Sequence, residues 1–367
     1  MVDYAGLVSH LSHDKAPFAL LTMQATATAG VLKRSFPERF KSLFSAEHGF
    51  FGIVAPGEKT GADNHPYWKL PIHSLYGEHR HPTPELLEGV ERMVVDLCDI
   101  AVRCYTYLAT LKNTLESCAA AGIPVTVVDR EIPLGGIVDG PMREDEFSSF
   151  VAPVNVPLCH AMTPGECALW MRDTLPVPVE LTVIKLKDWN HRRRAPWINF
   201  VPPSPAIRSW DSAVMYPRTV FAEAYPAVDC DRAGSLAFRV VGAPWIDQKR
   251  VMDELVSPLA ACGIGVQPYR YRPGSGEYAG ESIDGILFSV ADPDGFYPVK
   301  AGVTVLSALM RRYADEVDRG ARPEWADKLY GSSSVREALA DGDTARLFES
   351  WIDGHRRHLE NRVDIYG

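Results

Sequence analysis

The sequence lacks the features that would assign it to a membrane, secreted or nucleic-acid-binding class of protein. No apolar stretch approaches the roughly 20 residues that span a bilayer, and the N-terminus carries no signal-peptide pattern. The seven cysteines are odd in number and never spaced as CxxC, so we expect buried, reduced thiols in a cytoplasmic protein. With a net charge of −9, neither nucleic acid nor an anionic membrane is the expected partner.

Several common catalytic motifs are absent as well. There is no P-loop and no GxSxG elbow, and Gly135-Gly136 lacks the third glycine and the following helix of a dinucleotide fingerprint. Phosphoryl transfer, hydride transfer and serine hydrolysis therefore have no support. Histidines cluster early in the chain without the i, i+4 helical spacing of a zinc site: His48, His65, His73, His79 and His81. We expect neither a metal nor another cofactor.

The chain does show a regular alternation of short apolar runs and helix-like stretches, which is typical of α/β proteins. Runs at residues 18–22, 43–46, 92–97, 123–128 and 179–186 read as strands, and residues 105–121 and 164–173 as helices. Thr83 and Pro84 predict a further helix start, as N-cap and first helical residue. A second alternation begins near residue 235. We therefore predict a larger domain over residues 1–235 with a mostly parallel sheet, and a smaller α/β domain over residues 236–367.

Three of the apolar runs lead into a carboxylate: Glu47, Asp99 and Asp129. Ligands of open α/β sheets bind outside the carboxyl ends of the strands. If these strands are neighbours, the three acids share one sheltered crevice, and we expect an acid/base active site there. Glu47, followed by a glycine that lets the chain turn, is the expected general acid, and Asp99 or Asp129 the second carboxylate.

Other polar residues close to these strand ends are candidates for lining the same pocket: His48, Arg103, Tyr105, Tyr107, Arg130 and His160. For the Asp–Arg pairs a structural ion pair is the alternative. Thr163 and Glu166, just after His160, fit a helix capping box. Arg192, Arg193 and Arg194 form either a solvated run or a clamp for an acidic group.

The chain resembles a known family in a series of motifs that keep the same order along most of its length. They are Ser45–Gly52, Leu70–Gly77, Pro82–Glu85, Asp96–Asp99, Arg103–Tyr107, Asp129-Arg130 with Gly135-Gly136, His160–Thr163 with Gly165-Glu166, Pro203–Pro205, Tyr216-Pro217, Gly242–Asp247 and Tyr278–Gly280. In these residues the chain resembles the exo-β-N-acetylmuramidases, glycoside hydrolases of peptidoglycan salvage. The resemblance implies a Rossmann-like N-terminal domain, a cleft between the domains, and removal of a terminal N-acetylmuramic acid without metal or nucleotide, with Glu47 as the leading acid.

The chain departs from the family at several polar positions. Ile132-Pro133 replaces an Asn-Pro, Ala206 replaces an asparagine after Ser-Pro, and Glu277 replaces a lysine. Glu223 lies in the segment that replaces the family's Glu-Gly-Thr-Asn stretch, and we expect it to contact the substrate. Retained acid/base residues beside lost asparagines indicate a changed substrate.

Three functions stay open at this point. The first is a glycoside hydrolase that cleaves a terminal amino sugar. The second is a repurposed family member that catalyses another acid/base reaction in small-molecule biosynthesis, and the third is a non-catalytic binder of sugar fragments. All three imply a small-molecule ligand, and the sequence leaves open whether the chain forms a homodimer.

Overall fold

The computed structural model describes residues 1–23, 26–55, 57–59, 61, 63–192 and 200–367. Its N-terminal part is built on a seven-stranded sheet in the order β3 (Asp63–Asn64), β4 (Pro71–Ser74), β2 (Phe40–Ser45), β1 (Phe18–Leu21), β5 (Arg92–Val95), β6 (Val125–Val128) and β9 (Leu181–Ile184). Every pairing is parallel except that of β3 with β4. The predicted α/β class with a mostly parallel sheet is therefore confirmed.

Side chains alternate between the two faces of this sheet, and helices cover both faces. Phe18 and Leu20 of β1 pack with α1 (Tyr4–Leu11) and α2 (Thr28–Ser35), whereas Ala19 and Leu21 belong to the larger core. That core also holds the apolar residues of α3 (Tyr107–Ala121) and α4 (Pro164–Thr174). Burial on both faces explains why these strands read as continuous apolar runs in the sequence.

The helix ends follow local sequence signals in two of three places. α4 begins with the predicted capping box, in which Thr163 and Glu166 each bond the other's backbone N–H. α3 ends at Gly122, whose φ of 66° suits a left-handed cap. The helix predicted from Thr83 is wrong, because residues 84–89 form turns and Gly89 leaves helical geometry at a φ of 72°.

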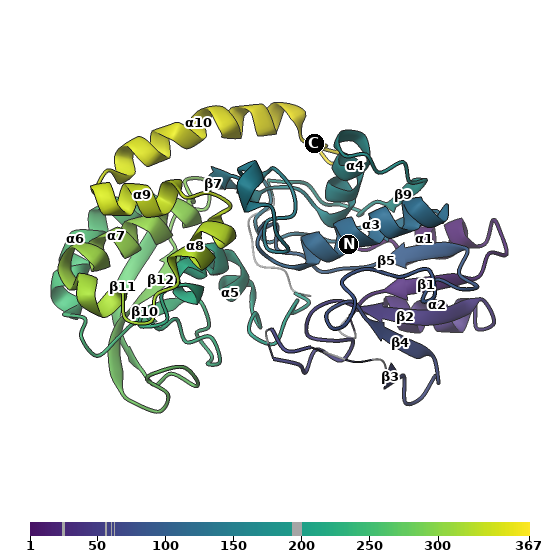
Figure 1. Ribbon diagram of the computed structural model, residues 1–367, viewed down its shortest axis with the longest axis horizontal. Helices are drawn as coiled ribbons and strands as arrows, with labels where there is room; N and C mark the ends of the chain where they lie inside the picture. The colour runs from purple at the N-terminus through teal and green to yellow at the C-terminus, as the bar shows by residue number, and fades with distance from the viewer. Residues whose placement is uncertain (24–25, 56, 60, 62, 193–199) are drawn as a thin grey trace.

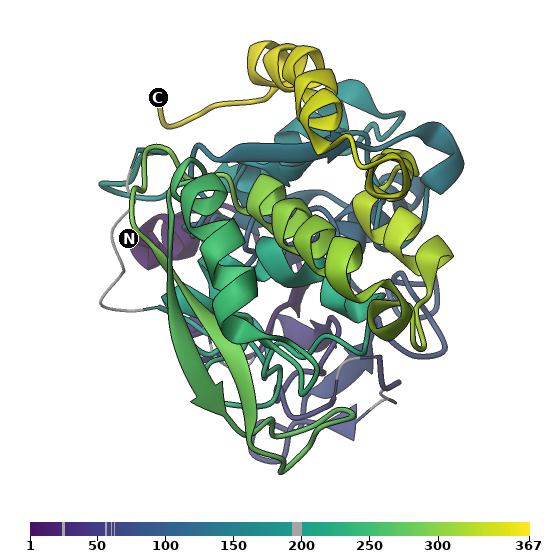
Figure 2. The same cartoon turned by 90° about the vertical axis from the view of Figure 1, so that its left-hand side faces the viewer.

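The C-terminal part has its own antiparallel sheet, in the order β10 (Val240–Gly242), β12 (Ile283–Val290) and β11 (Ile264–Tyr271). Helices α6 (Gln248–Ala260) and α7 (Pro298–Val317) lie beside this sheet (Figure 2). The segment of α5 (Trp210–Met215) and the 3₁₀ helix η2 (Tyr216–Glu223) packs against α7, β12 and α8 (Pro323–Tyr330). A short two-stranded sheet of β7 (Val138–Met142) and β8 (Pro157–His160) and the 3₁₀ helix η1 (Asp145–Phe147) complete the middle of the chain.

The end of the chain ties the two parts together. After α9 (Ser334–Asp341), α10 (Thr344–Asn361) runs over the molecule and brings the C-terminus beside α4 (Figure 1). The hydroxyl of Tyr366 donates a hydrogen bond to Asp129 and accepts one from the backbone N–H of Leu186, at the end of β9. Among the described residues, no helix combines the length and the apolar character that crossing a membrane requires.

Candidate active site

A cavity of about 520 Å³ lies where the carboxyl end of β2 meets η2 and α8. Its walls therefore come from both parts of the chain. The polar residues that line it include Glu47, His48, Tyr76, Arg80, Tyr105, Thr106, Ser204, Tyr216, Glu223, Arg232, Arg322 and Lys328. Four residues that the sequence singled out are among them: Glu47, His48, Tyr105 and Glu223.

Glu47 follows β2 by two residues and is held by two donors. The hydroxyl of Thr106 donates to Oε2 at 2.6 Å, and the backbone N–H of Gly57 donates to Oε1 at 2.9 Å. Both bonds fix the position of the carboxyl group. His48 and Gly49 both adopt left-handed backbone, with φ of 73° and 72°, which turns the chain sharply after Glu47.

His48, the next residue, is buried. Desolvation lowers the pKa of its imidazole, while the hydrogen bond between Nδ1 and the carbonyl of Val54 acts in the opposite direction. A neutral imidazole therefore stands beside the carboxylate of Glu47 at neutral pH.

Glu223, the last residue of η2, brings the second carboxylate into the cavity. Its Oε1 lies 3.4 Å from the guanidinium of Arg232. Burial raises the pKa of Glu223, Arg232 opposes that rise, and the charge of Glu47 adds to it. Glu47 and Glu223 thus line one cavity and interact electrostatically, which is the arrangement that pushes the protonation states of two acids apart.

Basic side chains outnumber acidic ones in this cavity. Arg80 is held between two rings, 4.0 Å from the centre of Tyr76 and 4.4 Å from that of Phe150. Arg232, Arg322 and Lys328 bring three further positive charges from the C-terminal part, against the two carboxylates. In a chain with a net charge of −9, this local excess of positive charge favours an anionic ligand.

Asp99 and Asp129 are not among the described residues that line the cavity, so the expectation that three acids share one hollow is wrong. In the sheet order, β1 separates β2 from β5, and β6 follows β5. Since neighbouring strands lie about 4.8 Å apart, the end of β6 is roughly 14 Å from that of β2. Sequence order alone could not reveal this spacing.

Both aspartates are instead buried among hydrogen-bond donors. Asp99 accepts the backbone N–H of Ala101 at 2.7 Å, and burial raises the pKa of Asp99 to about 7. Asp129 accepts bonds from the hydroxyl of Thr163, the N–H of Gly165 and the hydroxyl of Tyr366, while burial raises the pKa of Asp129 to about 6. These contacts place Asp129 where α4 and the C-terminal tail meet the sheet.

The two predicted pocket arginines lie outside the cavity and make structural contacts. The guanidinium of Arg103 is fully buried and donates to the carbonyls of Pro141, Val156 and Tyr330. Arg130 forms a two-point ion pair with Asp96, with N–O distances of 2.5 and 2.7 Å. Arg103 therefore joins the core to the end of α8, and Arg130 braces the ends of β5 and β6.

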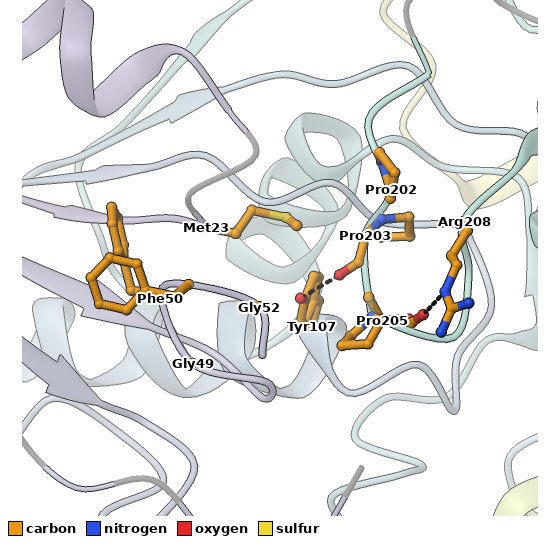
Figure 3. A pocket seen from close by; sticks show the side chains of 11 residues that line it. Met23, Gly49, Phe50, Gly52, Tyr107, Pro202, Pro203, Pro205 and Arg208 are labelled. Atoms are coloured by element: carbon orange, nitrogen blue, oxygen red, sulfur yellow. Dashed lines mark hydrogen bonds between the residues drawn. The ribbon is translucent and has the colours of Figure 1, made fainter. Parts of the chain in front are cut away.

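The remaining candidates are also displaced from the cavity. His160 is fully buried, and burial lowers its pKa to about 3. Tyr107 lines a neighbouring hollow, where its hydroxyl donates to the carbonyl of Pro203 at 2.6 Å (Figure 3). Arg193 and Arg194 lie outside the described residues.

Several polar residues of the cavity were not predicted as site residues from the sequence, among them Arg80, Thr106, Arg232, Arg322 and Lys328. Thr106 carried a usable signal, since it lies at the start of the predicted helix over residues 105–121, which follows Asp99. The others come from loops and from α8, and only the docking of the two parts brings them together.

One cluster has the residue types of a metal site. Ligand atoms of Glu166, His191 and Asp364 lie within 4.8 Å of one another. Oε1 of Glu166, however, already accepts bonds from His191 Nε2 at 2.8 Å and from the N–H of Ile365 at 3.0 Å. These hydrogen bonds explain why the three residues lie together: they anchor the C-terminal tail.

Comparison with known proteins identifies the family. Residues 16–211 match the N-terminal domain, and residues 214–366 the C-terminal domain, of the exo-β-N-acetylmuramidase NamZ. The chain belongs to the NamZ family. It is 30% identical over 328 residues to the peptidoglycan β-N-acetylmuramidase NamZ of Bacillus subtilis strain 168, covering 88% of this chain and 77% of that protein. The expected family and enzyme class, a glycoside hydrolase, are thereby confirmed.

Solved structures of similar proteins share the fold of this NamZ-family chain. A DUF1343 family protein of Bacteroides fragilis NCTC 9343 superposes with a TM-score of 0.88 at 24% identity, covering 100% of this chain and 99% of its own. A second DUF1343 protein of the same strain gives a TM-score of 0.73 at 22% identity, covering 95% and 92%. The two-part architecture is therefore common to these proteins.

Proposed function

We propose that this NamZ-family chain hydrolyses the glycosidic bond of a terminal N-acetylmuramic acid residue in the cavity between its two parts. The observation that carries the proposal is the presence of two carboxylates, Glu47 and Glu223, in one cavity lined by several basic side chains. Most glycoside hydrolases use such a pair of acids. Family membership supports the same reaction.

The two carboxylates differ in ways that suit different roles. Burial raises the pKa of Glu223, which suits a proton donor, while two hydrogen bonds hold the carboxyl group of Glu47 in place. The sequence had assigned the donor role to Glu47. We propose that Glu47 is one catalytic residue, that Glu223 is the other, and that Glu223 gives the proton.

In this scheme Glu223 protonates the glycosidic oxygen as its bond to the anomeric carbon breaks. Glu47 takes a proton from water, whose oxygen forms the new bond to that carbon. One water is consumed, and proton exchange with solvent restores both acids. This order inverts the anomeric centre, whereas attack by Glu47 itself followed by water retains it. NMR of the first product distinguishes the two.

The basic side chains suit the acidic group of this sugar. N-acetylmuramic acid carries a lactyl carboxylate, and the guanidinium of Arg80, stacked between Tyr76 and Phe150, presents a fixed planar donor. We propose that Arg80 binds this carboxylate. Asp99 and Asp129 act in this proposal as positioning residues that fix the strand ends behind the cavity.

The decisive experiment compares Glu47→Gln, Glu223→Gln and the exposed control Glu88→Gln on two muramic acid glycosides. One is a disaccharide, and the other carries a 2,4-dinitrophenyl group that leaves without a proton. Removing the proton donor costs about 10²- to 10⁴-fold on the disaccharide and far less on the dinitrophenyl glycoside. Removing the other carboxylate abolishes both activities. We expect Glu223→Gln to follow the first pattern and Glu47→Gln the second; the reverse would return the donor role to Glu47.

A repurposed enzyme is the second candidate. Glu277 stands where the family resemblance leads us to expect a lysine, and it forms an ion pair with Arg319 at 2.8 Å. The positive charge of that lysine is therefore replaced by a carboxylate that Arg319 neutralises. A wild-type protein that neither binds nor cleaves muramic acid glycosides would support this second candidate. Binding without turnover would indicate a sugar-fragment binder.

We also propose a cytoplasmic location. All seven cysteines are buried and unpaired, which suits a reducing compartment. Cell fractionation with an antibody against the native chain tests this, and recovery outside the cytoplasm would contradict it.

A further inference from the structure

An open groove of about 460 Å³ lies between α10 and the start of α7. Tyr297 and Lys300 line it from the α7 side, and Ile352, His355 and Leu359 are among the residues that line it from α10. In Figure 1, α10 runs along the top edge of the molecule. The groove is therefore accessible to another molecule.

Exposed apolar side chains gather in this groove. The exposed fraction is 57% for Ile352, 49% for Leu359 and 39% for Tyr297. The other large apolar side chains that are exposed in the described part of the chain all lie outside the groove: Met1, Ile53, Tyr67, Val256 and Tyr269. A gathered apolar patch of this kind is typical of a surface that binds another protein.

The opposite face of α10 is packed against the rest of the chain. Leu347 and Trp351 are buried. Gly354 lies so close to β7 that a Cβ at this position would come within 2.7 Å of the side chain of Met142. The exposed face is thus fixed before any partner arrives, and such a preformed surface loses little conformational entropy on binding.

The exposed residues of α10 have the spacing of a seam between two helices. Ala345, Ile352 and Leu359 are all exposed and follow one another at intervals of seven residues, so they form one stripe along the helix. Glu349 and Arg356 are exposed as well and flank the stripe with opposite charges. An apolar seam with charged flanks is the pattern by which two helices pair.

The charges on this stripe complement those of an antiparallel copy of the same stripe. In an antiparallel pair that crosses at Ile352, Ala345 lies opposite the partner's Leu359, and Glu349 lies opposite the partner's Arg356. A parallel pair would instead place two glutamates opposite each other and two arginines opposite each other. Because opposed like charges are costly in an interface, the stripe favours the antiparallel arrangement.

We propose that two copies of this chain form a dimer in which their α10 helices pack antiparallel across a twofold axis at Ile352. Such a contact uses the same surface of both copies. At about 1.5 Å per residue, the 18 residues of α10 span about 27 Å, which is the width of an interface that buries about 800 Å² on each partner. Arg356 also pairs with Asp353 of its own helix at 2.8 Å, and its guanidinium has further donors for the partner's Glu349.

Sedimentation velocity of the full chain tests the dimer. At concentrations up to about 100 μM, where even weak interfaces form, the wild type should reach twice the 40.6 kDa of one chain. Ile352→Glu places two like charges at the axis and should raise the dimer dissociation constant about 100-fold or more. Val256→Glu, at an exposed apolar position of α6, is the matched control and should leave the constant unchanged.

Reversal of single charges tests the antiparallel packing. Glu349→Arg and Arg356→Glu should each weaken the dimer about tenfold, because each places like charges opposite one another twice. When the two variants are mixed in equal amounts they should associate again, since every opposed pair then has opposite signs. In a parallel dimer neither variant would weaken the association, because like charges would already face each other.

Three results would overturn the proposal. They are a wild type that stays monomeric at every concentration, which would assign the groove to a different partner, a dimer that withstands Ile352→Glu, and a dimer that withstands both charge reversals. The three substituted positions are exposed, so these variants should fold, and far-UV circular dichroism checks this. The inference goes beyond the proposed glycosidase function, and its readout is mass alone, so either can fail without the other.

Discussion

The charge of Arg232 should set the upper pH limit of activity through Glu223. Its guanidinium lies 3.4 Å from the Glu223 carboxylate and opposes the rise in the pKa of Glu223 that burial causes. Substituting Arg232→Gln removes the charge and leaves the burial. The pKa of Glu223 should then rise further, so that the proton donor stays protonated to higher pH. The basic limb of the pH–rate profile should move upward.

Coulomb's law gives the size of this shift. At 3.4 Å, two unit charges interact by about 5 kcal/mol at an effective dielectric constant of 20 and by about 1.2 kcal/mol in bulk water. The side chain of Arg232 is 38% exposed, so solvent screens the pair and the lower figure is the better guide. Since 1.36 kcal/mol corresponds to one pKa unit, the expected shift is about one unit.

The assay is the pH dependence of kcat for the disaccharide in wild type, Arg232→Gln and the charge-retaining control Arg232→Lys. Arg232→Gln should move the basic limb upward by about one unit, and Arg232→Lys should leave it nearly in place. A limb that stays fixed in Arg232→Gln, or that moves to lower pH, would refute the assignment of Glu223 as the proton donor.

Three further predictions concern stability. Burial raises the pKa of Asp99 to about 7, so the folded chain keeps a proton that the unfolded chain loses near pH 4. The free energy of unfolding of the wild type should therefore fall between about pH 4 and pH 7, by at most about 4 kcal/mol. Urea denaturation at pH 5 and pH 8 should show this fall in the wild type and not in Asp99→Asn. Tyr366→Phe deletes the hydroxyl that bonds Asp129 and Leu186 and should lower the free energy of unfolding by about 1–3 kcal/mol. Arg103→Met leaves three buried carbonyls without a donor and should cost about 3 kcal/mol or more.

Each of these variants has a matched control at an exposed position: Asp294→Asn, Tyr67→Phe and Arg34→Met. The controls should change the free energy of unfolding by less than about 0.5 kcal/mol. Loss of glycosidase activity in a well-folded Asp99→Asn would contradict its role as a positioning residue and make it a catalytic candidate again. Variants of Tyr366 or Arg103 as stable as their controls would show that these contacts do not hold the two parts together.

Local signals were sufficient for much of the fold. The strand β1 and the strand β6 are apolar runs buried on both faces, and α4 carries its own capping box. The helix predicted at Thr83 failed because a good cap cannot extend a helix past the left-handed Gly89. No element was predicted at β7, β8 or α8; β7 and β8 pair with each other, and α10 packs against β7.

The site was predictable only in part. Glu47 could be found because it follows an apolar strand and precedes a glycine turn, and the structure puts it in the cavity together with His48, Tyr105 and Glu223. Asp129 has a similar sequence context but lies three strands away from β2. A strand–carboxylate pattern gives the edge of the sheet at which an acid lies, and says nothing of its distance from another acid along that edge.

The sequence by itself determined the class of fold, the family and the first candidate for a catalytic acid, because strand periodicity, turn glycines and family motifs are local properties of the chain. The pairing of Glu47 with Glu223 and the stacking of Arg80 were decided by the tertiary structure alone. Each depends on the order of strands in the sheet and on the docking of η2 and α8 against the end of β2. Long-range packing sets these distances, and no local pattern encodes them.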